Sequence, residues 1–187
     1  MPRIPSPSIP GIVGLFAARP DTAKPLQLLA EALLRGPFAE GSTLSRGERE
    51  LIAAVVSTRN ECVFCSSSHA AFAAAQIEGG KDTVEAARRD PKTAPVSPKM
   101  KALLAVAEQA QKGGLHVTDA AVDAARKEGA TDVDVHDTIL IAAAFCMFNR
   151  YVDGLAAITP TEPAAYDAMA SVIVEQGYVR AITRPVA

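Results

Sequence analysis

Residues 45–69 read SRGERELIAAVVSTRNECVFCSSSH, and this stretch decides the fold because it predicts two consecutive helices. Ser45 and Glu48 have the spacing of a capping box, so the first helix should begin there and continue to about Ser57. Residues 51–56 are apolar on every side of that helix, which predicts that the helix is buried.

A second helix follows a short break in the apolar pattern. Thr58, Arg59 and Asn60 interrupt that pattern, and Asn60 is a plausible N-cap for a helix over residues 61–77. The pair Gly79-Gly80 should close this helix.

The rest of the chain is also helical in pattern. No strand-like alternation bounded by hairpin turns occurs, so the sequence predicts an all-α fold of roughly eight helices. The further helices are expected over 12–18, 22–35, 82–89, 98–112, 118–128, 131–148 and 162–176, with Ser97 and Thr131 near two of the starts.

Composition indicates one domain. The chain has 187 residues, of which 49% are hydrophobic and 5% aromatic, with no Trp, a composition that suits closely packed helices. Residues 1–10 are rich in proline and are expected to form an extended arm on the surface or on a neighbouring subunit. Residues 11–187 then form a single helical domain.

Charge and cysteine content exclude several classes of protein. Nineteen basic and twenty-one acidic residues give a net charge of −2, which argues against partners such as nucleic acid or an anionic membrane. The apolar runs are too short to span a bilayer, and prolines interrupt any signal pattern at the start. Three cysteines do not make a disulfide scaffold, so a cytoplasmic location is expected, where a CxxC pair is catalytic, redox-active or metal-binding.

Cys62 and Cys65 form the CxxC pair, and His69 follows four residues later. If Asn60 caps the helix, Cys62 lies in its first turn, where unpaired amide groups favour a thiolate. Residues three and four apart share a helix face, so the imidazole can exchange a proton with Cys65. Glu50 comes from the preceding buried helix, and a buried carboxylate beside imidazole would orient the ring and relay protons.

These four side chains suit thiol redox chemistry. One thiolate attacks a peroxide oxygen or an oxidised sulfur, and the other thiol resolves the product to an internal disulfide. Two plainer interpretations remain, namely buried inert thiols and a zinc half-site completed by His69. Zinc needs a fourth ligand, and neither a second CxxC nor an HxxxH motif supplies one. Glu50, His116, His136 or Cys146 could supply that zinc ligand only if the fold happened to bring one of them close. Cys146 is expected instead to be a buried hydrophobe. Arg150 and Asp153 are expected to have structural roles.

Glu50 followed by Cys62-x2-Cys65-x3-His69 resembles the motif of the alkylhydroperoxidase D (AhpD-like) proteins of the carboxymuconolactone decarboxylase superfamily. The resemblance extends from residues 44–50 to residues 149–154, and the second stretch is similar to the subgroup called peroxidase-related proteins. It implies an all-helical homo-oligomer, such as a dimer, trimer or hexamer, that reduces hydroperoxides with a cysteine pair and needs no cofactor or metal.

The resemblance also implies individual roles. Cys65 would attack the peroxide, Cys62 would resolve the product, and His69 and Glu50 would form the proton relay. The well-studied members have a histidine immediately before the second cysteine, whereas this chain has Phe64. Those members are reduced by a lipoylated partner, so a dithiol reductant of the lipoylated or thioredoxin-like kind is expected.

Two other functions stay open at this point. The superfamily includes cofactor-free lactone decarboxylases, in which His69 and Glu50 would act on a carbon acid and the thiols would be incidental. A non-catalytic helical oligomer that senses oxidation or binds a small ligand is the third alternative.

Overall fold

The computed structural model describes residues 2–180, without the side chain of Arg180, and this part of the chain is helical and contains no strand. The predicted all-α class is confirmed. None of the described helices is both long and apolar enough to cross a bilayer. The helices are α1 (Gly11–Ala18), α2 (Pro20–Leu34), α3 (Arg46–Arg59), α4 (Val63–Ala74), α5 (Gly80–Arg89), α6 (Pro98–Lys112), the 3₁₀ turn η1 (Gly114–His116), α7 (Asp119–Lys127), α8 (Asp132–Gly154) and α9 (Pro163–Arg180).

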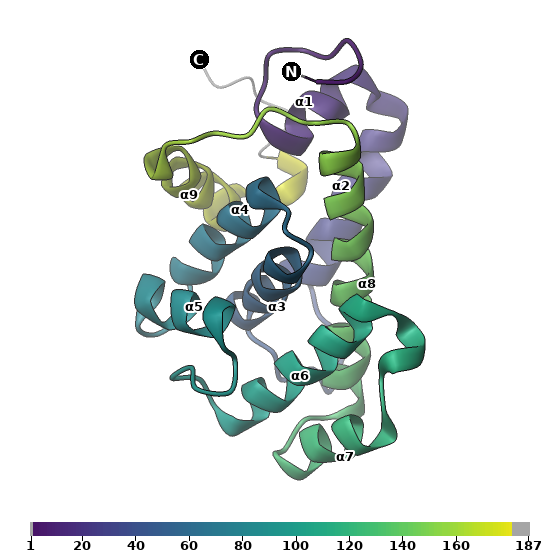
Figure 1. Cartoon of the computed structure of the whole chain (residues 1–187), viewed down its shortest axis with the longest axis vertical. Coiled ribbons are helices and arrows are strands. Elements are labelled where there is room, and N and C mark those ends of the chain that lie inside the picture. The colour runs from purple at the N-terminus through teal and green to yellow at the C-terminus, as the bar shows by residue number, and fades with distance from the viewer. Residues whose placement is uncertain (1, 181–187) are drawn as a thin grey trace.

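Helix α3 lies at the centre of the molecule. It packs against α2, α4, α5, α6 and α8, and Figure 1 shows it surrounded by these elements. The side chains of residues 51–56 are all 0% exposed, which confirms the burial predicted from their pattern. Each buried Leu, Ile or Val of this run stabilises the fold by about 1.5–3 kcal/mol, so α3 anchors the core.

The start of α3 is fixed by the predicted capping box. The Ser45 hydroxyl accepts a hydrogen bond from the backbone N–H of Glu48 at 3.2 Å, and the Glu48 carboxylate accepts one from the backbone N–H of Ser45 at 2.8 Å. Arg49, in the same turn, is buried and pairs with Asp137 on α8 at 2.5 Å. Its guanidinium also lies over the ring of Phe38, at 3.8 Å from the centroid. These contacts hold α3 in one register against α8.

The junction between α3 and α4 differs from the prediction. Asn60 ends α3 instead of capping α4, because its side-chain amide bonds to Asn149 and Gln111, both at 2.8 Å. Glu61 then takes a left-handed conformation with φ 59°, and Cys62 occupies the N-cap position of α4.

The expected closing glycines are also placed differently. Helix α4 ends at Ala74, and Gly79, with φ 74°, is instead the N-cap residue of α5. Glycine takes such a conformation readily, whether it precedes a helix or follows one.

Helix α9 packs against α4 and α2 and contains a break at Gly177, where φ is 79° and ψ is 175°. The regular part before this break agrees with the expected helix over 162–176. After the break, the backbone N–H of Tyr178 donates to the Glu31 carboxylate of α2 at 2.6 Å. Before the break, the carbonyl of Glu175 accepts a hydrogen bond at 2.9 Å from Arg35, the residue that follows α2. We call this set of bonds the α2–α9 contact.

The proline-rich arm lies against its own chain, beside the end of α8. The Arg3 guanidinium donates to the carbonyls of Gly154, at 2.7 Å, and Asp153, at 3.1 Å. The backbone N–H of Gly11 donates to the carbonyl of Ile158 at 2.7 Å. The arm therefore covers the connection that leads from α8 to α9, as Figure 1 shows at the top of the molecule.

Candidate active site

Glu50 of α3 and His69 of α4 are in contact. The two helices pack along each other, and the distance between His69 Nδ1 and Glu50 Oε2 is 2.6 Å. Glu50 is 2% exposed, so the carboxylate has almost no access to water. The predicted pair of imidazole and buried carboxylate is thus brought together.

The ring of His69 is held by aromatic neighbours. Phe145 of α8 meets it edge-on at a centroid distance of 4.5 Å, and Phe72, one turn further along α4, does so at 5.2 Å. An ionised carboxylate only accepts hydrogen bonds, so Nδ1 carries the proton that is donated to Glu50. Nε2 is then the ring atom that can accept a proton.

Tyr178 is a third member of this group, and no sequence motif pointed to it. Its hydroxyl donates to Glu50 Oε1 at 2.5 Å. The pKa of Tyr178 is raised well above its usual 10, first by burial and then by the negative charge of Glu50. The phenol therefore keeps its proton and remains a donor.

Both cysteines stand at the beginning of α4 as free thiols. Cys62 is 0% exposed and Cys65, the third residue of the helix, is 4% exposed. They pack with Phe64, Val152 and Tyr166 in a small apolar cluster that is separate from the main core. Because Cys65 and His69 are four residues apart on one helix, they lie on the same face.

The surroundings of Cys62 do not favour a thiolate. The pKa of its thiol is raised, first because the thiol shares a hydrogen bond with Cys65 and then because of burial, with a smaller contribution from Asp153. Our expectation that the helix start would favour a thiolate is wrong for this cysteine, since Cys62 lies at the N-cap position, before the first turn. Cys62 keeps its proton at neutral pH.

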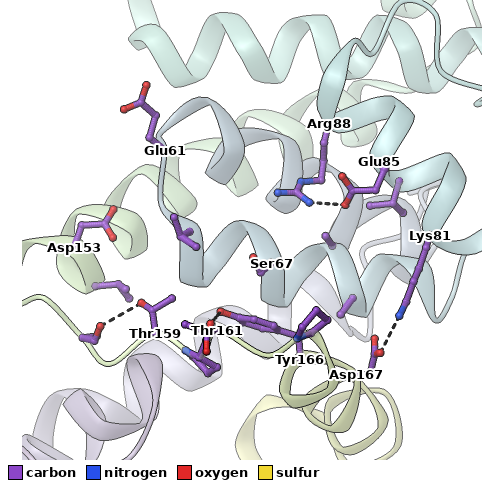
Figure 2. Close-up of a pocket in the computed structure, with 18 of the residues that line it drawn as sticks. Glu61, Ser67, Lys81, Glu85, Arg88, Asp153, Thr159, Thr161, Tyr166 and Asp167 are labelled. Atoms are coloured by element: carbon purple, nitrogen blue, oxygen red, sulfur yellow. Dashed lines mark hydrogen bonds and ion pairs between the residues drawn. The ribbon is translucent and has the colours of Figure 1, made fainter.

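An open pocket of about 750 Å³ lies beside the cysteine cluster, between α4, α5, the end of α8 and the start of α9. Four of its lining residues also belong to the cysteine cluster or pack against it, namely Ala71, Val152, Ala157 and Tyr166. The Tyr166 hydroxyl donates to the carbonyl of Pro160 at 2.8 Å, which fixes the ring between the pocket and the thiols. Figure 2 shows the charged lining residues spread around Ser67 and Tyr166.

The charges around this pocket are unevenly balanced. Arg88 pairs with Glu85 at 2.5 Å, and Lys81 pairs with Asp167 at 2.8 Å, as the dashed lines in Figure 2 mark. Glu61 and Asp153 also line the pocket. Neither forms an ion pair with a basic side chain among residues 2–179. The edge of the pocket is therefore negative overall.

The remaining candidates lie outside this group. His136 is exposed beside Asp137 at 3.3 Å, and Arg150 donates to the carbonyl of Cys146 at 2.8 Å, in line with the structural role expected for it. Cys146 is only half-buried, and its sulfur contacts the amide of Asn60 at 3.5 Å, so it is not the fully buried hydrophobe we expected. Within the described part of the chain, no three His, Cys, Asp or Glu side chains are grouped as a metal ion would require.

A model of a known protein family matches the part of the chain that contains these residues. The model described as "Carboxymuconolactone decarboxylase family" matches residues 20–109. The matched range runs from α2 into α6 and contains Glu50, both cysteines of the CxxC pair and His69. No curated protein is similar enough to match.

Solved structures have the same fold. The chain is similar to an uncharacterized peroxidase-related protein with an alkylhydroperoxidase AhpD core from Ralstonia eutropha JMP134, with 25% identity, a TM-score of 0.75 and coverage of 87% of this chain and 81% of that one. An uncharacterized peroxidase-related protein from Silicibacter sp. TM1040 has 24% identity, a TM-score of 0.73 and coverage of 85% and 79%. A protein of unknown function from Agrobacterium tumefaciens, described as a candidate antioxidant defence protein AhpD, has 18% identity, a TM-score of 0.66 and coverage of 81% and 99%.

Proposed function

The chain is an AhpD-like member of the carboxymuconolactone decarboxylase superfamily, and from this premise we propose that it is a thiol-dependent hydroperoxide reductase. One observation carries the proposal. A CxxC pair stands at the start of α4 on the same helix as His69, whose Nδ1 is 2.6 Å from the buried carboxylate of Glu50. Thiols, a proton acceptor and a group that orients the acceptor are thus assembled together.

In the first step, His69 accepts the proton of Cys65, and the thiolate attacks an oxygen of the hydroperoxide. The O–O bond breaks, the sulfur is oxidised to a sulfenic acid, and the alkoxide takes the proton back from His69 to leave as an alcohol. Glu50 stabilises the imidazolium while the ring holds that proton.

In the second step, Cys62 attacks the sulfenic acid of Cys65. A disulfide forms between the two sulfurs, and the hydroxyl leaves as water with the proton that Cys62 releases. The raised pKa of Cys62 suits this order, because its thiol stays protonated until the sulfenic acid has formed. A dithiol reductant of the lipoylated or thioredoxin-like kind then exchanges with the disulfide and restores both thiols.

The pocket beside the cysteines supports an uncharged organic substrate. Its walls include Val63, Val84 and Ala157, which would hold the hydrocarbon part of a hydroperoxide. The carboxylates of Glu61 and Asp153 at its edge would repel an anionic substrate. That the protein works as a homo-oligomer stays a prediction.

The test is consumption of cumene hydroperoxide with a dithiol such as dihydrolipoamide, comparing wild type with Cys65→Ser and Cys62→Ser. We expect Cys65→Ser to be inactive, and Cys62→Ser to stop after one equivalent of peroxide with a sulfenic acid that dimedone traps. Cys146→Ser is the matched control and should keep wild-type turnover.

Undiminished turnover in both Cys62→Ser and Cys65→Ser would contradict the proposal. Alkylation of the thiols separates the alternatives, because a lactone decarboxylase that uses only His69 and Glu50 would remain active after it. Reversible disulfide formation without turnover would point instead to a redox sensor.

A further inference from the structure

We infer that Tyr178 is a positioning residue, which acts through Glu50 to hold the ring of His69 in the orientation and tautomer that proton transfer needs. The kinetic consequences of this inference rest on the proposed function. The hydrogen-bond geometry behind it does not depend on that function, so the inference can be tested by NMR as well as by kinetics.

Each oxygen of the Glu50 carboxylate has its own hydrogen-bond donor. Oε2 accepts from His69 Nδ1 at 2.6 Å, and Oε1 accepts from the Tyr178 hydroxyl at 2.5 Å. A carboxylate bound on both sides cannot rotate about its last bond without losing a charge-assisted hydrogen bond. The oxygen that faces His69 is therefore fixed, and with it the proton on Nδ1.

A break in α9 at Gly177 immediately precedes Tyr178, whose hydroxyl reaches Glu50. The backbone at Gly177 leaves the helical path, and the N–H of Tyr178 is held by Glu31 of α2. The backbone angles of Gly177 lie in a region that is essentially restricted to glycine, and an added Cβ, 2.2 Å from an Arg35 nitrogen and 2.6 Å from a Glu31 oxygen, would displace the two side chains that form the α2–α9 contact. The α2–α9 contact thus has a distant consequence, because it sets the position of the phenol.

Burial and the charged groups around the phenol keep its hydroxyl protonated. Glu50 on α3, His69 on α4 and Glu31 on α2, with its partner Arg35 at 3.8 Å, are the ionisable groups that face it or its backbone. Helix α8 contributes the uncharged ring of Phe145 to the histidine. Burial and the two carboxylates raise the pKa of Tyr178, so the hydroxyl is a donor throughout the working pH range.

The first test is Tyr178→Phe, which removes one oxygen and keeps the ring. The ring contacts with Phe72, at 6.4 Å, and His69, at 6.3 Å, should persist, so the variant should fold, with its melting temperature lowered only by the loss of this hydrogen bond. A hydrogen bond to a charged group contributes about 1.5–3 kcal/mol, so kcat/KM for cumene hydroperoxide should fall about 10- to 100-fold. The acidic limb of the pH–rate profile should move to higher pH, because the charged form of the relay has lost a donor.

Tyr151→Phe, on α8 and outside the site, is the matched control and should behave as wild type. A merely structural tyrosine would alter stability without moving the pH profile. If Tyr178→Phe leaves both kcat/KM and the pH profile unchanged in an active enzyme, the inference is overturned.

The second test needs no enzymatic activity. Nitrogen-15 NMR of the imidazole rings should show His69, assigned by its loss in His69→Gln, with a slowly exchanging proton on Nδ1. In Tyr178→Phe this proton should exchange faster. A ring protonated on Nε2, or an unchanged exchange rate in the variant, would refute the positioning role. A wild-type protein without peroxidase activity would refute the proposed function instead and leave this measurement to decide on Tyr178.

Discussion

The two cysteines of the CxxC pair are three positions apart and yet differ in their surroundings. Cys62 precedes the helix, is fully buried, and its pKa is raised by its neighbour Cys65 and by burial. Cys65 lies inside the first turn of α4, one turn before the imidazole of His69. This asymmetry supports the proposal that Cys65 is the attacking sulfur and Cys62 the resolving one.

Alkylation tests this asymmetry residue by residue. Because the Cys62 thiol stays protonated, iodoacetamide should modify Cys62 more slowly than Cys65 in the native protein between pH 6 and 9. Peptide mapping by mass spectrometry measures both rates, and the denatured protein, in which both should react alike, is the control. Faster labelling of Cys62 would contradict the assigned roles.

Residues that act locally could be predicted from the sequence, and residues that act over long distances could not. The capping box at Ser45 and the apolar run of α3 depend on neighbours within a few positions, and both are confirmed. Asn60 has the composition of an N-cap, but its amide is used by Asn149 and Gln111, which come from α8 and α6. Tertiary contacts decide such a side chain.

The residues of the site likewise divide into those whose contacts are predictable from nearby sequence and those whose contacts are not. Glu50 and His69 could be paired in advance because α3 and α4 are consecutive helices joined by a short connection. The contact of Tyr178 with Glu50 joins residues 128 positions apart and depends on a left-handed backbone at Gly177. Neither condition leaves a pattern in the sequence.

Among the elements, the end of α9 determines whether the site is complete. Its last turn is attached to α2 by Glu31 and Arg35, and Gly177 permits the bend that directs Tyr178 toward Glu50. Loss of this attachment would leave the cysteines and His69 in place while removing one donor from the carboxylate.

Gly177→Ala should therefore reduce both stability and activity. A left-handed conformation costs a non-glycine residue about 1–2 kcal/mol, and here the new methyl group would also collide with Arg35 and Glu31. Gly129→Ala is the matched control, because Gly129 has φ +91° but no atoms within 4 Å of an added Cβ. Urea unfolding of both variants measures the difference, and equal losses would show that the bend has no effect beyond backbone strain.

For the molecule as a whole, the pocket beside the cysteines brings together residues of α4, α5, α8 and α9. Its neighbourhood is completed by the N-terminal arm, since Arg3 binds the carbonyls of Asp153 and Gly154 at the end of α8. The arm itself does not line the pocket, but it binds the backbone of Asp153, which does.

Filling the pocket should change the selectivity for substrate size. Ala157→Phe places a ring in the cavity, so kcat/KM for cumene hydroperoxide should fall about tenfold or more, while that for hydrogen peroxide should change little. Ala168→Phe, on the exposed side of α9, is the control. An equal loss for both peroxides would show that this pocket does not receive the organic group.

The burial of α3 has one further consequence for anyone who wishes to redesign this protein. The helix with the least contact with water also carries the carboxylate of the relay, so mutational tolerance there is limited twice, by packing and by proton chemistry. A library that varies α3 would mostly return unfolded clones. New specificities should be sought among the residues of the 156–163 connection, where side chains can be exchanged without disturbing either constraint.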